Sequence, residues 1–272
     1  MSASSMVTDV TANQPNVEDA GRRLVVLWQD PDSREIEPIG ILALESAVYS
    51  FVYLERVSDI ASFQPLFGFP DIRRRYTSAN LFSLFAQRAL DPQRADFSRH
   101  VEQLGLPADT TPWEQIARSG GRREGDTLQF FPMPVRDGEV ISCSFLVNGI
   151  RHLWAKAVTA DGMEFHLTQS EVEAALGRLQ PGDPLSLLPE PTNTYHSSAS
   201  LVVDGSTTPL GYLPHVLCED IALLGDDAVV AVEVERVNGP DAPWHIRLMA
   251  RLTINADSDF SFFSGPSWRT AA

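Results

Sequence analysis

The stretch LLPEPTNTYHSSASLVV, residues 187–203, places a polar loop between two apolar runs. Short apolar runs bounded by Pro, Asn and Ser indicate strands, so the stretch predicts two strands joined by a turn. Two interpretations of the loop are open. Either Pro189, Pro191 and Asn193 shape a simple connection that Tyr195 anchors through its ring and hydroxyl, or the polar side chains line a binding site.

The C-terminal half around this loop has the pattern of a β-rich domain. From about Ser142, short apolar runs alternate with turns such as Asp204-Gly205. Evenly spaced short strands are typical of a small barrel or sandwich. Two helices accompany them, one with Ser170 and Glu173 as a capping box and one over residues 215–224.

The N-terminal half begins with strands. Residues 23–30 form an apolar run, and Tyr49, Phe51 and Tyr53 alternate along a second run. Spacing by two residues predicts antiparallel strands with one buried face, so these aromatic side chains are expected in the core rather than on a base-stacking surface.

Helical segments follow the strands. Ser78 is a candidate N-cap for the first, and Gly105 marks the end of the second. Thr111 and Glu114 form a capping box for the third, which ends at Gly120. The sequence therefore predicts an α+β protein, in which a small β-sheet with helices precedes a β-rich unit.

The chain length favours two domains, because 272 residues exceed the usual size of one. We assign them to residues 21–136 and 137–272. Residues 1–20 are acidic and rich in Ser, Thr and Asn, which predicts a disordered leader.

Composition limits the classes of function. The net charge of −15 argues against a protein whose whole surface attracts nucleic acid, although local patches can still do so. No apolar run is long enough to cross a bilayer, and no secretory signal is recognisable. The two cysteines, Cys143 and Cys218, are expected to be buried thiols of a cytoplasmic protein.

Catalytic signatures are missing from the sequence. It contains no nucleophile elbow, phosphate-binding P-loop, zinc-protease or kinase motif, and its histidines lack metal-ligand spacing. We therefore expect no enzyme activity, no metal and no cofactor. The turn Gly120-Gly121-Arg122-Arg123 suits either a phosphate cradle or a helix end followed by a surface turn, and the second interpretation is favoured.

Three segments of the C-terminal half resemble a HIRAN domain in the right order. They are LVNGIRHL at 146–153, the stretch 182–203 that contains the opening loop, and LGYLPHVLCEDIALL at 210–224. The resemblance implies a small β-barrel of OB or SH3-like type, with one or two helices, that binds single-stranded DNA or DNA ends.

The same resemblance implies the binding residues. Position by position, the family's site falls on Arg151, His152, Asn193, Tyr195, His196 and Tyr212. Two aromatic residues usually follow the arginine in the family, whereas this chain has His152 and Leu153 there. The loop's usual acid and second amide are replaced by His196 and Ser198.

The N-terminal half resembles the small N-terminal subdomain of HipA-type proteins. The resemblance rests on residues 40–57, on PLFGFP at 65–70, on LFSLFAQRAL at 81–90 and on SGGRREGDTLQFFP at 119–132. No kinase segment follows. A bacterial protein that joins the two modules is implied, and an antitoxin-like partner of a HipA-type kinase is the alternative to DNA binding.

Overall fold

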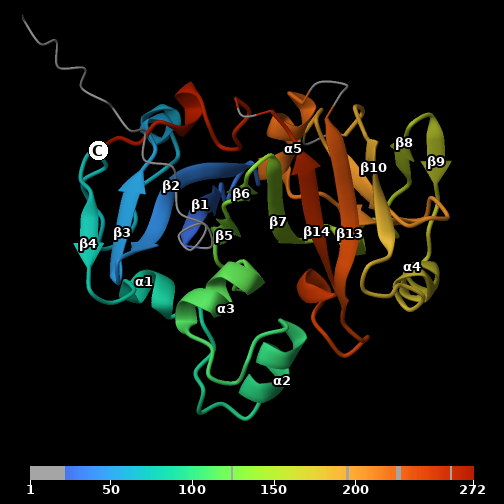
Figure 1. Ribbon diagram of the computed structural model, residues 1–272, viewed down its shortest axis with the longest axis horizontal. Coiled ribbons are helices and arrows are strands. Elements are labelled where there is room, and N and C mark those ends of the chain that lie inside the picture. The colour runs from blue at the N-terminus through green and yellow to red at the C-terminus, as the bar shows by residue number, and fades with distance from the viewer. Residues whose placement is uncertain (1–21, 124, 194–195, 225–227, 258) are drawn as a thin grey trace, which may run out of the picture.

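The computed structural model describes residues 22–272 except 124, 194–195, 225–227 and 258 (Figure 1). The leader predicted at residues 1–20 lies outside the described residues. The chain has a mixed α+β fold with antiparallel sheets, as the sequence predicts. No helix in the described part of the chain is long and apolar enough to span a bilayer.

The N-terminal sheet has five strands in the order β4-β3-β2-β1-β5. They are β1 (Arg23–Gln29), β2 (Ile36–Glu45), β3 (Val48–Tyr53), β4 (Tyr76–Ser78) and β5 (Leu128–Pro132). Every neighbouring pair is antiparallel. The 3-10 helix η2 (Glu55–Asp59) and the helices α1 (Ser83–Ala86), α2 (Phe97–Gln103) and α3 (Pro112–Ser119) lie between β3 and β5 in the chain.

One face of this sheet forms its own core. Leu24, Val26 and Phe51 pack there with the aromatic residues that follow β3 and with α3. Phe51 and Tyr53 are fully buried, so the prediction that the alternating aromatics belong to the core is confirmed.

Three of the four predicted helix signals in this half are confirmed. Gly105 follows the C-cap of α2 in the left-handed conformation with φ 69°. Thr111 and Glu114 form the capping box of α3, and Gly120 ends that helix in the left-handed conformation with φ 70°. The N-cap predicted at Ser78 is wrong. Ser78 pairs with Tyr49 as the last residue of β4, and α1 begins later, after Phe82.

The C-terminal sheet has seven strands in the order β12-β11-β10-β13-β14-β7-β6. They are β6 (Val135–Asp137), β7 (Val140–Leu146), β10 (Pro184–Pro189), β11 (Ser200–Val203), β12 (Pro209–Tyr212), β13 (Val229–Val237) and β14 (Leu248–Asn255). A separate hairpin pairs β8 (Val158–Ala160) with β9 (Met163–Phe165). Short 3-10 helices follow β7, β13 and β14: η3 (Ile150–His152), η4 (Trp244–Ile246) and η5 (Pro266–Trp268).

The sheet closes on itself at one residue pair. Asn148, just after β7, forms an isolated antiparallel bridge with Tyr212 at the end of β12. Because β7 and β12 lie near opposite ends of the strand order, this bridge turns the sheet into a barrel. The predicted β-barrel is confirmed.

Two helices accompany the barrel, α4 (Gln169–Leu176) and α5 (His215–Ala222), as predicted. The capping box predicted for the first is wrong by two residues. Thr168 accepts the backbone N–H of Glu171, whose carboxylate accepts the N–H of Thr168 in return, so Ser170 lies inside the helix.

The two halves share a core. The second face of the N-terminal sheet, with Val25, Leu27 and Phe131, packs among the buried residues of the barrel. An ion pair joins Arg118 of α3 to Glu235 of β13. The division into two domains, residues 21–136 and 137–272, stays a prediction.

The end of the chain returns to the N-terminal sheet. The backbone N–H of Ala271 donates to the Tyr53 carbonyl at 2.9 Å, and the N–H of Glu55 donates to the Arg269 carbonyl at 2.9 Å. Residues 269–271, which the predicted boundary assigns to the second domain, therefore lie along the edge of the first sheet.

Candidate nucleic-acid interface

The candidate interface lies where the barrel closes. Asn148 and Tyr212 exchange both backbone hydrogen bonds, with N···O distances of 2.9 and 2.8 Å. This pairing brings the segment after β7 against the end of β12. Two of the three sequence segments that resemble a HIRAN domain therefore meet at one point.

Two glycines make this contact possible. Gly149 has φ 65°, and a Cβ on it would lie 2.9 Å from Cδ2 of Tyr212. Gly211 has φ 145°, and a Cβ there would lie 2.5 Å from the Asn148 carbonyl oxygen. A side chain at either position would separate the two strand ends, because both positions combine close approach with a φ that favours glycine.

Arg151 and His152 project from the turn that Gly149 starts. Both are exposed and belong to η3. No described residue forms an ion pair or a side-chain hydrogen bond with the Arg151 guanidinium. Leu153, which stands at a position where the family usually has an aromatic residue, is fully buried and is not available for stacking.

Tyr212 and Asn193 are joined by a buried carboxylate. Glu190 is 5% exposed, and its side chain bonds the Tyr212 hydroxyl. Asn193 donates from Nδ2 to Oε2 of Glu190 at 2.5 Å, and its Oδ1 accepts the backbone N–H of His196 at 3.2 Å. Burial, together with the Glu190 charge, raises the pKa of Tyr212. These contacts hold Glu190 and Asn193 against Tyr212 at the barrel seam, which we define as the Asn148–Tyr212 closure and the residues beside it.

The His196 side chain packs on α5 rather than at the seam. Its ring stacks on His215 of α5, with centroids 3.5 Å apart and planes 13° apart. Together with Glu37 and Arg56 of the N-terminal half, both rings line a polar cavity of about 330 Å³. His196 therefore lies at the junction of the two halves.

Of the six predicted site residues, the structure brings Arg151, His152, Asn193 and Tyr212 to the seam or to the loop attached to it. His196 is directed to the junction. Tyr195 lies outside the described residues, so its predicted anchoring or binding role stays a prediction.

Two tryptophans lie beside η3 that sequence reasoning did not select. Trp154 and Trp244 have ring centroids 5.0 Å apart, and the Arg247 guanidinium lies 4.8 Å from the centroid of Trp244. Both are partly exposed. Trp154 and Trp244 are far apart in the sequence, so no local pattern predicts that they pair. The turn at Gly149 and η3 brings Trp154 to η4.

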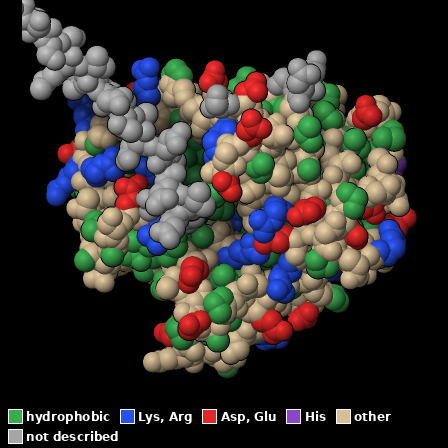
Figure 2. Space-filling view, viewed as in Figure 1, with side chains coloured by type: hydrophobic (Ala, Val, Ile, Leu, Met, Phe, Trp, Pro, Cys, Tyr) green, Lys and Arg blue, Asp and Glu red, His purple; other side chains and the backbone are tan. Residues whose placement is uncertain are grey.

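Several basic side chains lie near η4. Burial lowers the pKa of His245 in η4, and nearby Arg122, His100 and Arg151 lower it further. Figure 2 shows acidic and basic side chains interspersed over one face, with several basic ones grouped near its middle. Arg122, His100 and Arg151 thus surround His245 although the net charge of the chain is −15.

In the described part of the chain, no group of three His, Cys, Asp or Glu side chains is arranged to hold a metal ion. Cys143 and Cys218 are buried free thiols, as predicted, and burial raises the pKa of each to about 12.

Part of the C-terminal half is similar to a known domain family. Residues 157–257 match the family model of the HIRAN domain. The crystal structure of the HIRAN domain of human HLTF is a structural neighbour with 16% identity and a TM-score of 0.26, covering 42% of this chain and 72% of that one. A search of the curated proteins found no match.

Residues 157–257 are therefore similar to the HIRAN domain. The match includes Asn193, His196 and Tyr212 and begins shortly after Arg151 and His152. These comparisons do not show the HipA-like character of the N-terminal half, which stays a prediction.

Proposed function

We propose that the HIRAN domain of this chain binds single-stranded DNA or DNA ends without catalysing a reaction on them. The observation that carries the proposal is the barrel seam, where the Asn148–Tyr212 pair presents Arg151 to solvent with no acidic partner among the described residues. An exposed, unpaired guanidinium is suited to a phosphate group.

The seam residues have two different tasks in this proposal. Arg151 contacts a phosphate and His152 borders it. Tyr212 and Asn193 act as positioning residues, because Glu190 already engages the Tyr212 hydroxyl and the Asn193 amide. Trp154 and Trp244 offer partly exposed aromatic surface on which an unpaired base could stack.

The absence of catalysis is part of the proposal. At the seam the described ionisable side chains are a guanidinium, an exposed imidazole and a buried carboxylate held by Tyr212 and Asn193. No nucleophile lies within hydrogen-bond reach of a free base among them, as nucleophilic catalysis would require.

Fluorescence anisotropy with a labelled single-stranded oligonucleotide tests the proposal. We expect Arg151→Ala to weaken binding about tenfold, since a charge-assisted phosphate contact is lost. Arg75→Ala removes the same charge from an exposed loop of the N-terminal half and is the matched control. Its affinity should stay within about twofold of wild type.

Two further comparisons sharpen the test. Binding should weaken steeply between low and moderate salt, because association is favoured by the release of cations from the strand and this release gains less free energy as the salt concentration rises. A strand with a blocked 3′ end separates recognition of ends from recognition of any single strand. Equal affinity of all three proteins, or no binding at low salt, would reject the proposal and turn attention to a protein partner.

A further inference from the structure

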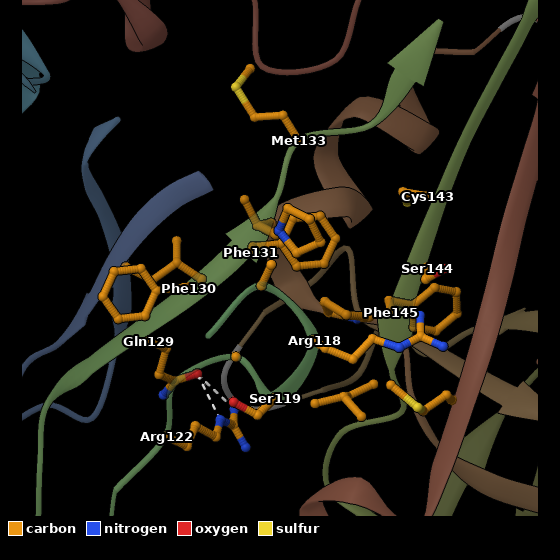
Figure 3. Close-up of a pocket in the computed structure, with 18 of the residues that line it drawn as sticks. Arg118, Ser119, Arg122, Gln129, Phe130, Phe131, Met133, Cys143, Ser144 and Phe145 are labelled. Carbon is orange, nitrogen blue, oxygen red and sulfur yellow. Dashed lines mark hydrogen bonds between the residues drawn. The ribbon is translucent and has the colours of Figure 1, made fainter. Parts of the chain in front are cut away.

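A second cavity lies between the two halves, about 330 Å³ in volume (Figure 3). In Figure 3, β5 forms one wall with Gln129, Phe130 and Phe131, and β7 forms the opposite wall with Cys143, Ser144 and Phe145. Cavities of a few hundred Å³ are large enough for small organic ligands.

Most of the lining is apolar and much of it aromatic. Trp113, Phe131, Phe145 and Met249 contribute to it. A flat apolar molecule would bury its faces against such walls, and this burial favours binding.

Charged groups enter the cavity from α3 and the turn after it. Glu114 is the acidic residue of the lining, and its carboxylate is held by Thr110 and Thr111 in the capping box. Arg118 is also satisfied, because it donates to Glu235 and to the Leu104 carbonyl.

Unlike Arg118, Arg122 has no carboxylate partner among the described residues. Its Nε and Nη2 both donate to the neutral Oε1 of Gln129, at 3.0 and 2.7 Å, and no described carboxylate pairs with it. Arg122 is only partly exposed, and this burial, which removes part of the hydration of the guanidinium, lowers its pKa. A partly desolvated cation with only a neutral partner attracts an anion.

Two glycines place Arg122 at this point. Gly120 and Gly121 follow α3 with φ 70° and 56°, and a Cβ on Gly121 would lie 2.6 Å from the Phe130 ring. The chain thereby folds back onto β5 beside Gln129. The turn at Gly120-Gly121, predicted to be a helix end, thus also places the Arg122 guanidinium at the cavity.

We propose that this cavity binds a small organic anion with a flat apolar body, whose acid group pairs with Arg122. The aromatic walls take the body, and the guanidinium takes a carboxylate, sulfonate or phosphate. Asn148 of the seam also borders this cavity, but the proposal rests on Arg122 and the aromatic walls and does not depend on DNA binding.

The probe for the test is 8-anilinonaphthalene-1-sulfonate, an aromatic sulfonate that fluoresces when it leaves water. Its uncharged relative N-phenyl-1-naphthylamine has a similar body without the acid group. The full-length folded protein should bind the sulfonate saturably at one site and more tightly than the uncharged relative. Arg122→Met should weaken the sulfonate about tenfold and leave the uncharged relative unchanged.

Arg123→Met is the matched control, because Arg123 is the exposed neighbour and donates only to the Gln87 carbonyl. A second variant, Ala117→Leu, fills part of the cavity and retains Arg122. It should weaken both probes, so the proposal stays testable if Arg122→Met does not fold. Unsaturable binding by wild type, or equal effects of Arg122→Met and Arg123→Met, would overturn the proposal.

Discussion

At the scale of single residues, the close contact between the two strand ends at the seam depends on Gly149. This glycine combines φ 65° with a close approach to the Tyr212 ring, whereas Gly162 in the β8–β9 turn has φ 72° and open space around it. Gly162→Ala should therefore lose about 1 kcal/mol of unfolding free energy, from the backbone conformation alone.

Gly149→Ala should lose about 1–2 kcal/mol more than Gly162→Ala, because its methyl group would also displace Tyr212. Urea denaturation of both variants measures the difference. Equal losses would show that the contact between Gly149 and Tyr212 contributes nothing to stability.

His215 gives a second prediction at this scale. Burial, with the nearby charges of His196 and Arg56, lowers its pKa from 6.5 to about 4. Its Nδ1 is buried without a hydrogen-bond partner among the described residues. The unfolded chain therefore binds this proton more readily than the folded one between pH 6.5 and about 4.

The contribution of neutral His215 to stability should be complete above pH 6.5 and should fall as the pH drops towards 4. His215→Gln removes this titration, so its unfolding free energy should change less over the window than that of wild type. Parallel pH profiles for the two proteins would contradict the depressed pKa. The exposed variant His152→Gln controls for the loss of any imidazole.

At the scale of elements, alternation and capping residues predicted most of what was found. The aromatic run in β3, the capping box of α3 and the position of α5 all follow from local sequence. The predictions that Ser78 and Ser170 are N-caps were wrong for the same reason. Each is a good capping residue, but strand pairing uses Ser78, and Thr168 lies at the position where α4 begins.

The corrected start of α4 gives a direct test. Thr168→Ala should lose about 1 kcal/mol, because the Thr168 hydroxyl accepts the N–H of Glu171. Ser170→Ala should be neutral or slightly stabilising, because Ser170 is exposed inside the helix, where alanine is the better residue. Thermal unfolding of the two variants compares them, and a larger loss for Ser170→Ala would contradict the cap.

At the scale of the whole molecule, the sequence could predict the barrel but not how it closes or what it packs against. The closing pair Asn148–Tyr212 joins residues far apart in the chain, and so does the pairing of Trp154 with Trp244. Contacts of this kind depend on the finished fold. Local patterns predict that Val25 faces one side of β1, but not that the barrel covers that side.

The shared core predicts that the two halves unfold together. Val25 and Leu27 are buried among barrel residues, so loss of either half exposes apolar surface of the other. Differential scanning calorimetry should show one transition, with equal calorimetric and van't Hoff enthalpies. Glu235→Gln, which breaks the ion pair with Arg118, should shift this transition down without splitting it. Two separate transitions would instead establish independent domains.

The central claim is that nucleic acid meets the barrel seam, and hydrogen–deuterium exchange with and without a single-stranded oligonucleotide tests it most directly. Contact should slow exchange in peptides that cover residues 149–154 and 211–213, while peptides that cover the exposed loop at Arg73–Arg75 should be unchanged. Unchanged exchange at the seam, when the oligonucleotide is bound and protects another surface, would contradict the account.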